Sequence, residues 1–324
     1  MTAIFNEAHS LILYIIFGYS ILLPLTMVSM KLLRITDPLQ RLRLYLVAFL
    51  TPPAAFILYH SVLVKRCESG LTPVWAEGAF HFLCAISENM LSLFLPLLSL
   101  MIIFAAIKAC VALIMIKRIE QNAPGIDKNI DENIRSIVTD ISRIINITPP
   151  KVIYSSREDF AAFTTGFLKP VLVINHKIPS ILSESQLGAL IGHELFHVLQ
   201  RDPLKNWVLH LLRDITLLNP LSALLLKGYL LEKEMICDRK AALIAGISTK
   251  EYAALLLKVW RTVLDYNTPS VFPASSFTGY WGMERRVGAL LNNNQEIYRH
   301  SKLSATFLGI AIFVSTMVFL GLVC

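Results

Sequence analysis

The sequence predicts an α-helical membrane protein with four transmembrane helices and an inserted, mostly helical α+β domain that contains a small sheet. Three observations lead to this fold class: a very apolar composition, an uneven distribution of charge, and four long apolar segments. Of the 324 residues, 55% are hydrophobic and 16% are charged, whereas soluble proteins contain roughly 25% charged residues. Residues 117–302 hold 41 of the 53 Asp, Glu, Lys and Arg side chains. This composition excludes a disordered chain and argues against an ordinary cytosolic enzyme.

Each of the four apolar segments is long enough, at about 20 residues, to cross roughly 30 Å of hydrocarbon. They cover about residues 11–30, 44–64, 91–116 and 303–323. The expected organisation is therefore an N-terminal membrane region over 1–116, a polar domain over 117–302, and a last transmembrane helix over 303–324. A cleavable signal peptide is a poorer interpretation of the first segment, because the residues before it contain Glu7 and no Lys or Arg.

The distribution of basic residues predicts the orientation. Lys and Arg gather between the first two segments, after the third and before the fourth: Lys31, Arg34, Arg41, Arg43, Lys117, Arg118, Arg299 and Lys302. Because basic residues favour the cytoplasmic side, we expect both termini outside and the polar domain in the cytoplasm, in a bacterial inner membrane. The net charge of +7 then reflects this bias and contact with anionic lipid. Direct nucleic-acid binding is not expected.

Periodicity and turn signals predict the elements of the polar domain. Apolar residues at helical spacing indicate a helix over 128–146. Short strands are expected over 151–154, 161–165 and 170–174, the last two forming a hairpin through Gly166. Capping boxes at Ser183 and Ser248 open helices that run to about 201 and 264, and another helix starts near 220 and continues past 234.

Residues 207–231 are apolar enough to suggest a further membrane crossing. Arg213, Asp214 and the Asn-Pro pair at 219–220 interrupt this stretch. A crossing here would also place the basic residues before the last segment outside. We therefore expect two buried or membrane-surface helices, and whether they cross or only touch the membrane stays open.

The first capped helix contains the motif HELFH at residues 193–197. His193 and His197, four residues apart, lie on one helical face, so both imidazoles can bind one cation. Zinc suits two imidazoles and one carboxylate, with a position left for water, and Glu194 is placed to take the proton of that water. The alternative is a pair of core histidines, but burying Glu194 between them would be costly without a purpose.

Glu234 and Asp238 are also four residues apart, on the helix after the Asn-Pro pair. One carboxylate can complete a site for one zinc ion per chain, and the other can accept the spare ring N–H of a ligand histidine. The alternative is a solvated charged face, because other charged residues surround the pair. Cys237, between the two acids, is expected to pack in the interior.

These motifs resemble the BlaR/MecR antirepressor family of integral-membrane zinc peptidases, which are gluzincins. The resemblance rests on HELFHVLQRD at 193–202, Asn-Pro at 219–220 and EMICD at 234–238. FTTGFLKPVLV at 163–173 and ERRVGALL at 284–291 extend it over about residues 117–302.

The resemblance implies a role for each matching residue. His193, His197 and Glu234 would be the metal ligands, Glu194 the general base, and Asp238 the carboxylate that holds a ligand histidine. The hairpin strand would hold an extended substrate by β-augmentation; its residues are Ala162, Phe163, Thr164, Thr165 and Gly166.

The resemblance also implies a zinc-dependent endopeptidase in regulated proteolysis or signal transduction. Its substrate would be a cytoplasmic or membrane-proximal protein, such as a transcriptional repressor or the chain itself. Because antirepressors of the best-known kind continue into a penicillin-binding sensor domain that this sequence lacks, a β-lactam receptor is not expected.

Two alternatives stay open. One is a quality-control peptidase similar to HtpX, which usually has two spans before the metal helix and two after. The other is a non-catalytic transducer with a structural metal, although structural zinc sites normally have four protein ligands and three are found. His176 and His210 could polarise an oxyanion, although a lone histidine is more often structural. Arg285 and Arg286 could bind substrate or the region of Asp202, but pairing at the surface is expected instead.

Overall fold

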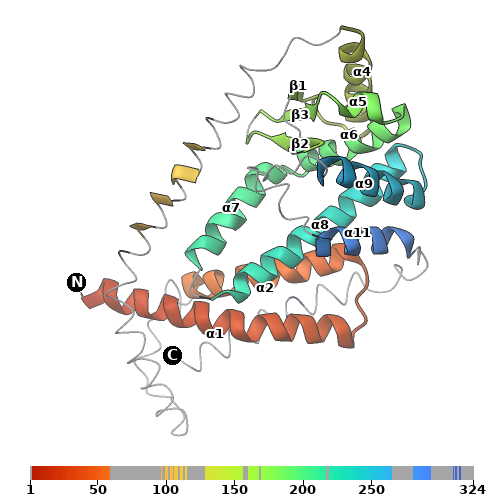
Figure 1. Ribbon diagram of the computed structural model, residues 1–324. Coiled ribbons are helices and arrows are strands. Elements are labelled where there is room, and N and C mark those ends of the chain that lie inside the picture. The colour runs from red at the N-terminus through yellow and green to blue at the C-terminus, as the bar shows by residue number, and fades with distance from the viewer. Residues whose placement is uncertain are drawn as a thin grey trace. The chain divides into compact units, whose positions relative to one another are not determined.

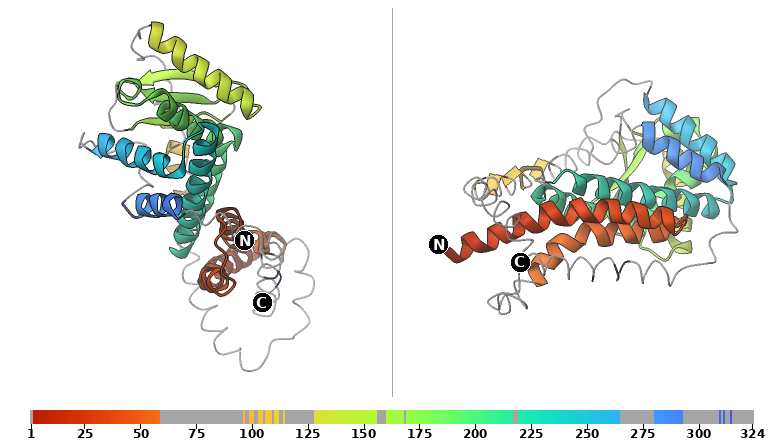
Figure 2. Two further views of the ribbon diagram at one scale, coloured as in Figure 1. Left: turned by 90° about the vertical axis from the view of Figure 1, so that its right-hand side faces the viewer. Right: turned by 90° about the horizontal axis from the view of Figure 1, so that it is seen from below.

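The computed structural model describes residues 2–58, 128–155, 160–167, 169–216, 219–264 and 280–292, together with isolated helical positions between 96 and 114 and at 309, 311 and 314. The chain divides into two compact units (Figures 1 and 2). The first contains residues 1–107, 209–232 and 296–324, and the second contains 108–208 and 233–295. Each unit is described by itself.

The first unit is built on two helices, α1 (Thr2–Leu32) and α2 (Pro38–Leu58), which lie side by side in Figures 1 and 2. A short loop joins them, and they pack antiparallel. The Tyr19 hydroxyl donates a hydrogen bond of 2.9 Å to the carbonyl oxygen of Phe49. Both helices continue through internal prolines, which helices in membranes tolerate because neighbouring groups satisfy the freed backbone.

Two further helices contribute to this unit. These are the end of α7 (Asp202–Ile215) and the beginning of α8 (Leu221–Ile244). They form an apolar core with α1 and α2 that includes Tyr19, Tyr45, Leu209, Leu225 and Tyr229. The expectation of two helices on either side of the Asn-Pro pair is confirmed.

Among the described residues, one helix is long and apolar enough to cross a membrane, over Ile15–Leu32 of α1. The second expected span coincides with part of α2, but residues 59–64 lie outside the described residues. Most of the third and fourth expected spans also lie outside them. The number of four transmembrane helices therefore stays a prediction.

The second unit contains a three-stranded sheet formed by β1 (Lys151–Ser155), β2 (Ala162–Thr165) and β3 (Val171–Asn175). The strand order is β1-β3-β2, with β1 parallel and β2 antiparallel to β3. All five residues of β3 are buried because it is the central strand. The expected β2–β3 hairpin is confirmed, and Gly166 has a φ of 91°, where a side chain would overlap the carbonyl oxygen of Lys169.

In the part of this unit that the structure describes, the sheet is accompanied by the start of α7, the end of α8 and five further helices: α4 (Lys128–Ile144), α5 (Ile178–Ile181), α6 (Glu184–Leu199), α9 (Thr249–Leu264) and α11 (Tyr280–Leu291). Apolar side chains of α4, α6, α8 and α9 form one core with the sheet, including Ile134, Leu172, Leu195, Ala241 and Tyr252. This core fixes α6 next to α8.

The expected capping boxes begin α6 and α9. The Ser183 hydroxyl accepts from the Gln186 N–H while the Gln186 side chain accepts from the Ser183 N–H, and Ser248 and Glu251 are paired in the same way. Helix α6 ends at Leu199, two residues before the expected end. The reason is that Arg201 adopts a left-handed φ of 54°, which the right-handed helix cannot continue through.

Candidate metal centre

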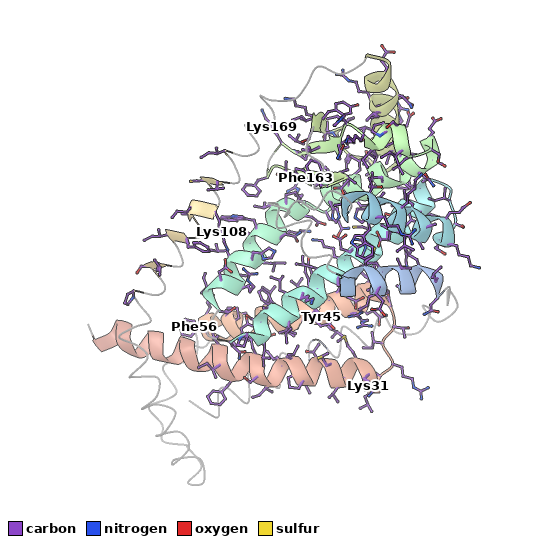
Figure 3. The ribbon with its side chains drawn as sticks, viewed as in Figure 1. Lys31, Tyr45, Phe56, Lys108, Phe163 and Lys169 are labelled. Carbon is purple, nitrogen blue, oxygen red and sulfur yellow. The ribbon has the colours of Figure 1, made fainter. Side chains whose placement is uncertain are left out.

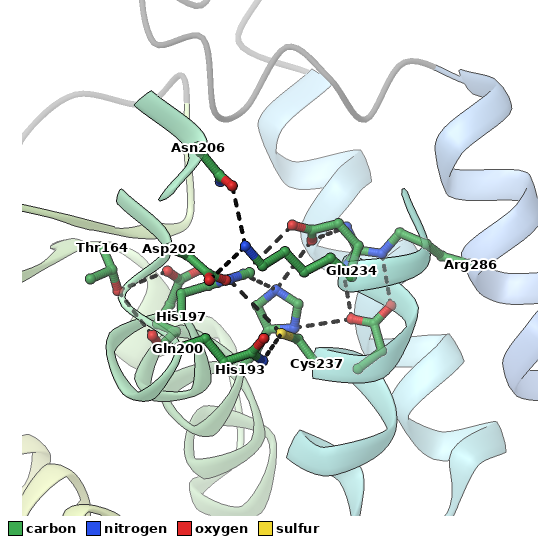
Figure 4. Close-up of polar contacts among 12 residues, drawn as sticks. Thr164, His193, His197, Gln200, Asp202, Asn206, Glu234, Cys237 and Arg286 are labelled. Carbon is green, nitrogen blue, oxygen red and sulfur yellow. Dashed lines mark hydrogen bonds and ion pairs between the residues drawn. The ribbon is translucent and has the colours of Figure 1, made fainter. Parts of the chain in front are cut away.

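Helix α6 presents the two histidines of the HELFH motif on one face (Figure 4). Their Nε2 atoms lie 3.1 Å apart. Because Glu194 follows His193 directly, its side chain leaves the same helix at a different angle. The three residues are held by a helix whose apolar face is in the core, so their positions are fixed by packing.

Helix α8 brings Glu234 to these histidines. Its Oε2 atom is 3.3 Å from His193 Nε2, and its Oε1 atom is 3.6 Å from His197 Nε2. Zinc–nitrogen and zinc–oxygen bonds of about 2.0–2.2 Å in a tetrahedron would separate neighbouring ligand atoms by roughly 3.3–3.6 Å. The donor atoms of His193, His197 and Glu234, which are separated by 3.1, 3.3 and 3.6 Å, could together hold one metal ion.

Asp238 lies one helical turn beyond Glu234 and is fully buried. Its Oδ1 atom is 3.1 Å from His193 Nδ1. The Tyr252 hydroxyl, from α9, lies 3.2 Å from both atoms of this pair. A carboxylate on Nδ1 leaves Nε2 of His193 to face a metal.

Asp202 does the same for the second histidine. Its Oδ2 atom is 2.7 Å from His197 Nδ1, and its Oδ1 atom is 2.6 Å from Lys233 Nζ. Lys233 also donates to Asn206 Oδ1 at 3.2 Å. The sequence contained Asp202 in the motif, but nothing in it assigned a role, because the α6–α7 turn decides where this side chain points.

Arg286 of α11 completes the polar cluster, and the expectation that it pairs at the surface is wrong. Its side chain is 7% exposed, and its Nε and Nη2 atoms donate to the two oxygens of Asp238 at 2.8 and 2.6 Å. Its Nη1 atom is 3.2 Å from Glu234 Oε2. A fully buried carboxylate and a half-buried one on the same helix face favour a cation nearby, which is the signal that could have identified this residue.

The charges of this cluster shift the pKa values of its members. For His193, burial lowers the pKa, but hydrogen bonds to Asp238 and Glu234 outweigh burial and raise it to about 10. Burial opposes the charged form of His197 too, and the neighbouring Cys237 and Asp202 raise its pKa well above its ordinary value. A proton held on Nε2 of either histidine must be displaced before a metal ion can bind there.

The two acids of α8 shift in the opposite direction. Burial alone would raise the pKa of Glu234 and of Asp238, but the Arg286 guanidinium, aided by the histidines, lowers both. Both are thus carboxylates at neutral pH, the form in which they can bind a metal or an imidazole N–H.

Glu194 is buried beside the histidines and is joined to the sheet. The Thr164 hydroxyl, on β2, lies 3.1 Å from Glu194 Oε2 and 3.1 Å from its carbonyl oxygen. The structure thus brings the middle of the expected substrate strand to the expected general base. Ala162, Phe163, Thr165 and Gly166 are half-buried around Thr164, and β2 is an edge strand of the described sheet.

Cys237 is buried, as expected of a packing residue, with its Sγ atom 3.7 Å from Gln200 Nε2 and 3.9 Å from His197 Nδ1. It forms a second possible donor group with His197 and Asp202, but that group needs the Nδ1 atom that Asp202 already binds. His176 is exposed and contacts the carbonyl oxygen of Ser155. Within the described residues, neither His176 nor His210 joins a group with metal-binding separations.

Comparison with known proteins gives a matching family model and similar relatives. The family model described as BlaR1 peptidase M56 matches residues 83–285. "Regulatory protein BlaR1" of Bacillus licheniformis is 30% identical over 133 residues, which cover 40% of this chain and 21% of that protein. "Protease HtpX homolog" of Archaeoglobus fulgidus is 29% identical over 119 residues, covering 36% of this chain and 33% of that protein. The chain therefore spans a minor part of the length of both relatives.

Proposed function

Since this chain belongs to the BlaR1 peptidase M56 family of membrane metallopeptidases, we propose that it is a zinc-dependent endopeptidase with its active site on α6 and α8. The observation that carries the proposal is the close approach of three donor side chains, His193, His197 and Glu234, at separations that suit one tetrahedral zinc ion. Three protein ligands leave the fourth position to water or substrate, which is typical of catalytic zinc sites.

The residues around the donors have separate roles in the proposed peptide hydrolysis. Zinc bound there would supply a Lewis acid that polarises the scissile carbonyl and lowers the pKa of a water molecule. Glu194 accepts the proton from that water as it attacks, and then passes the proton to the leaving amine. The Thr164 hydroxyl holds Oε2 of Glu194, which leaves Oε1 to face the water.

The outer carboxylates keep the donors in place. Asp238 and Asp202 hold the Nδ1 atoms of His193 and His197, so that both Nε2 atoms face one point between α6 and α8. Arg286 binds Asp238 and Glu234 together. These contacts reduce the reorganisation that metal binding requires.

The substrate is proposed to be an extended stretch of a protein. Strand β2, over Ala162–Thr165 and continuing to Gly166, lies at a sheet edge and touches Glu194 through Thr164. A peptide added along that edge would pass the catalytic carboxylate with its backbone extended, as β-augmentation provides. A cytoplasmic protein such as a transcriptional repressor, or the chain itself, is the proposed substrate, because a relative carries the name "Regulatory protein BlaR1".

The proposed function also includes the membrane topology that the sequence predicts. Four transmembrane helices, with both termini outside and one zinc ion in a cytoplasmic domain, would place the site next to the lipid surface of a bacterial inner membrane. Helix α1 supports the first of these spans.

A second candidate function uses the same chemistry on other substrates. The match to "Protease HtpX homolog" is almost as strong in identity as the match to BlaR1, and it favours a quality-control peptidase that acts on membrane proteins. The non-catalytic transducer is a weaker candidate. It gives no reason for Glu194 to be buried beside the donors and held by Thr164.

The test replaces Glu194 with Gln in cells and compares peptides and protein fragments with those of cells carrying the unmodified chain. Glu184→Gln is the matched control, because Glu184 is exposed in the first turn of the same helix. Fragments that disappear in Glu194→Gln and persist in Glu184→Gln support the peptidase, and their parent proteins separate a soluble regulator from membrane proteins. A fourth strain carries His193→Ala. Identical fragments in the first three strains, together with a phenotype that only His193→Ala loses, would establish the transducer instead.

A further inference from the structure

Residues 209–216, at the end of α7, and 219–232, at the beginning of α8, belong to the first unit, whereas the chain before and after them belongs to the second; we call these two segments the hairpin. His197 before the hairpin and Glu234 after it lie together in the donor cluster, so both flanks of the hairpin are on the same side of any membrane. We propose that this hairpin is re-entrant: it enters the hydrocarbon beside α1 and α2, turns at Asn219, and contacts lipid acyl chains without crossing. This inference rests on the proposed membrane location of α1.

The tip of the hairpin is bonded to the apolar part of α1. The Asn219 amide is buried and donates to the carbonyl oxygens of Ile15 and Ile16 at 3.3 and 2.8 Å, and to Ser20 Oγ at 3.2 Å. Its Oδ1 atom accepts from the N–H of Leu221 at 3.0 Å, at the start of α8. Hydrocarbon offers no partners to polar groups, and this amide takes all its partners from the protein.

The base of the hairpin lies at the other end of α1 and α2. Buried Glu232 forms an ion pair of 2.9 Å with Arg41, one of the basic residues that mark the cytoplasmic end of α2. Between tip and base, α8 packs closely on α2. A Cβ at Gly228 of α8 would lie 2.6 Å from the ring of Tyr45 of α2, which Figure 3 labels, so only glycine fits there. Asn219, at the tip, thus lies beside the middle of helix α1, and Glu232, at the base, lies beside the expected cytoplasmic end of α2.

The helical segments within the hairpin are too short to cross the membrane, although α8 as a whole continues beyond the hairpin to Ile244. From Leu221 to Glu232 helix α8 rises about 16 Å, at about 1.5 Å per residue, whereas the hydrocarbon is roughly 30 Å thick. All of α7, Asp202–Ile215, is about 21 Å long by the same rise. Segments of this length are shorter than the hydrocarbon is thick, so a hairpin that starts at the cytoplasmic side must return before it crosses.

The polar side chains within the hairpin are compatible with this depth. Arg213 pairs directly with Asp214, which neutralises both charges. The hydroxyls of Thr216 and Ser222 donate to the carbonyl oxygens of Arg213 and Asn219, at 3.0 and 2.9 Å. Lys227, which is exposed, is less than two turns from Glu232, so its long side chain can extend toward the headgroups.

The hairpin and α1 both expose large apolar side chains. Leu224 of α8 is 52% exposed, and Val28 of α1 is 60% exposed. Exposed side chains of this kind are costly in water and favourable against acyl chains. The occupant of this surface is therefore lipid of the cytoplasmic leaflet.

The first test introduces the photoreactive residue p-benzoylphenylalanine, in separate variants of the full chain in native membranes, in place of Leu224, Val28 or Ile144. Ile144 is the matched control, because it is 67% exposed and apolar but lies in the second unit, on α4. After irradiation, mass spectrometry should find phospholipid adducts at Leu224 and Val28 at comparable yields, and at most a tenth of that yield at Ile144. Adducts at Val28 without adducts at Leu224 would overturn the re-entrant hairpin. Absence of adducts at Val28 as well would overturn the membrane location of α1 in the proposed function, and the hairpin proposal with it.

The second test distinguishes a re-entrant hairpin from a crossing. A short epitope is inserted after Asn146, before the hairpin, or after Gly246, behind it, and antibody binding is measured on inside-out and right-side-out membrane vesicles. The proposal predicts that both epitopes are reached from the same face. Epitopes on opposite faces would show a crossing and refute it.

Discussion

Replacing Asp202 with Asn tests how the metal centre is held. Asp202 is buried and accepts from His197 Nδ1 at 2.7 Å, and its other oxygen pairs with Lys233 at 2.6 Å. Asn has nearly the same shape but no charge, so it cannot hold the imidazole tautomer as firmly. Removing such a carboxylate typically weakens metal binding 10–100-fold, which corresponds to about 1.4–2.7 kcal/mol.

The same substitution also removes the carboxylate that balances buried Lys233. Breaking a buried ion pair from one side costs about 3–5 kcal/mol of stability, and this loss must be separated from the loss of zinc affinity. The double variant Asp202→Asn/Lys233→Met removes both charges, which is often nearly neutral. We expect it to recover most of the unfolding temperature while zinc affinity stays 10–100-fold low.

The assay is a competition titration of zinc against a coloured chelator, on the full chain purified in detergent, with thermal unfolding measured on the same samples. Asp140→Asn is the control, because Asp140 forms an exposed ion pair with Arg143 on α4 and is expected to change neither quantity measurably. Zinc affinity of Asp202→Asn within twofold of the unmodified chain would refute the role given to Asp202. Full recovery of affinity in the double variant would also refute it.

Three further predictions concern other parts of the site. Thr164→Val should lower kcat about tenfold at unchanged zinc affinity, because Glu194 loses the hydroxyl that holds it; Thr164→Ser should retain activity, and equal kcat values for both variants would contradict this role. The pKa of His193 is raised from an ordinary 6.5 to about 10 in the metal-free chain, so its stabilising effect is complete below about pH 6.5 and is lost as pH rises toward 10. Between pH 7 and 10, unfolding temperature of the metal-free chain should therefore fall while zinc affinity rises, and the opposite trends would show that His193 is not protonated. Arg286→Met should lower the unfolding temperature on the order of 10 °C, because buried Asp238 loses its cation, whereas a similar drop for exposed Arg285→Met would refute a specific role.

The parts of the site that follow from local geometry could be predicted from the sequence. His193 and His197 share a helix face wherever that helix lies, and the Ser183 capping box begins the helix through bonds between near neighbours. The antiparallel pairing of β2 with β3 follows from a short connection through Gly166.

The remaining contacts depend on tertiary packing. Arg286 lies 48 residues from Asp238 in the chain, and an arginine in a charged stretch normally lies at the surface; only the arrangement of α11 beside α8 shows that it is buried. Asp202 reaches His197 because the chain turns at Arg201 with a positive φ, and no spacing rule predicts that turn. The grouping of residues 209–232 with α1 and α2 likewise depends on contacts such as that between Asn219 and Ile16.

The central claim is that His193, His197 and Glu234 bind one zinc ion that acts with Glu194 in peptide hydrolysis. The most direct measurement determines zinc content and cleavage of unstructured polypeptides on the same purified preparations of the unmodified chain, Glu194→Gln and His197→Ala. We predict one zinc ion per chain in the first two and a large loss in the third, with cleavage in the unmodified chain alone. Full zinc content in His197→Ala, or unchanged cleavage by Glu194→Gln, would contradict the claim.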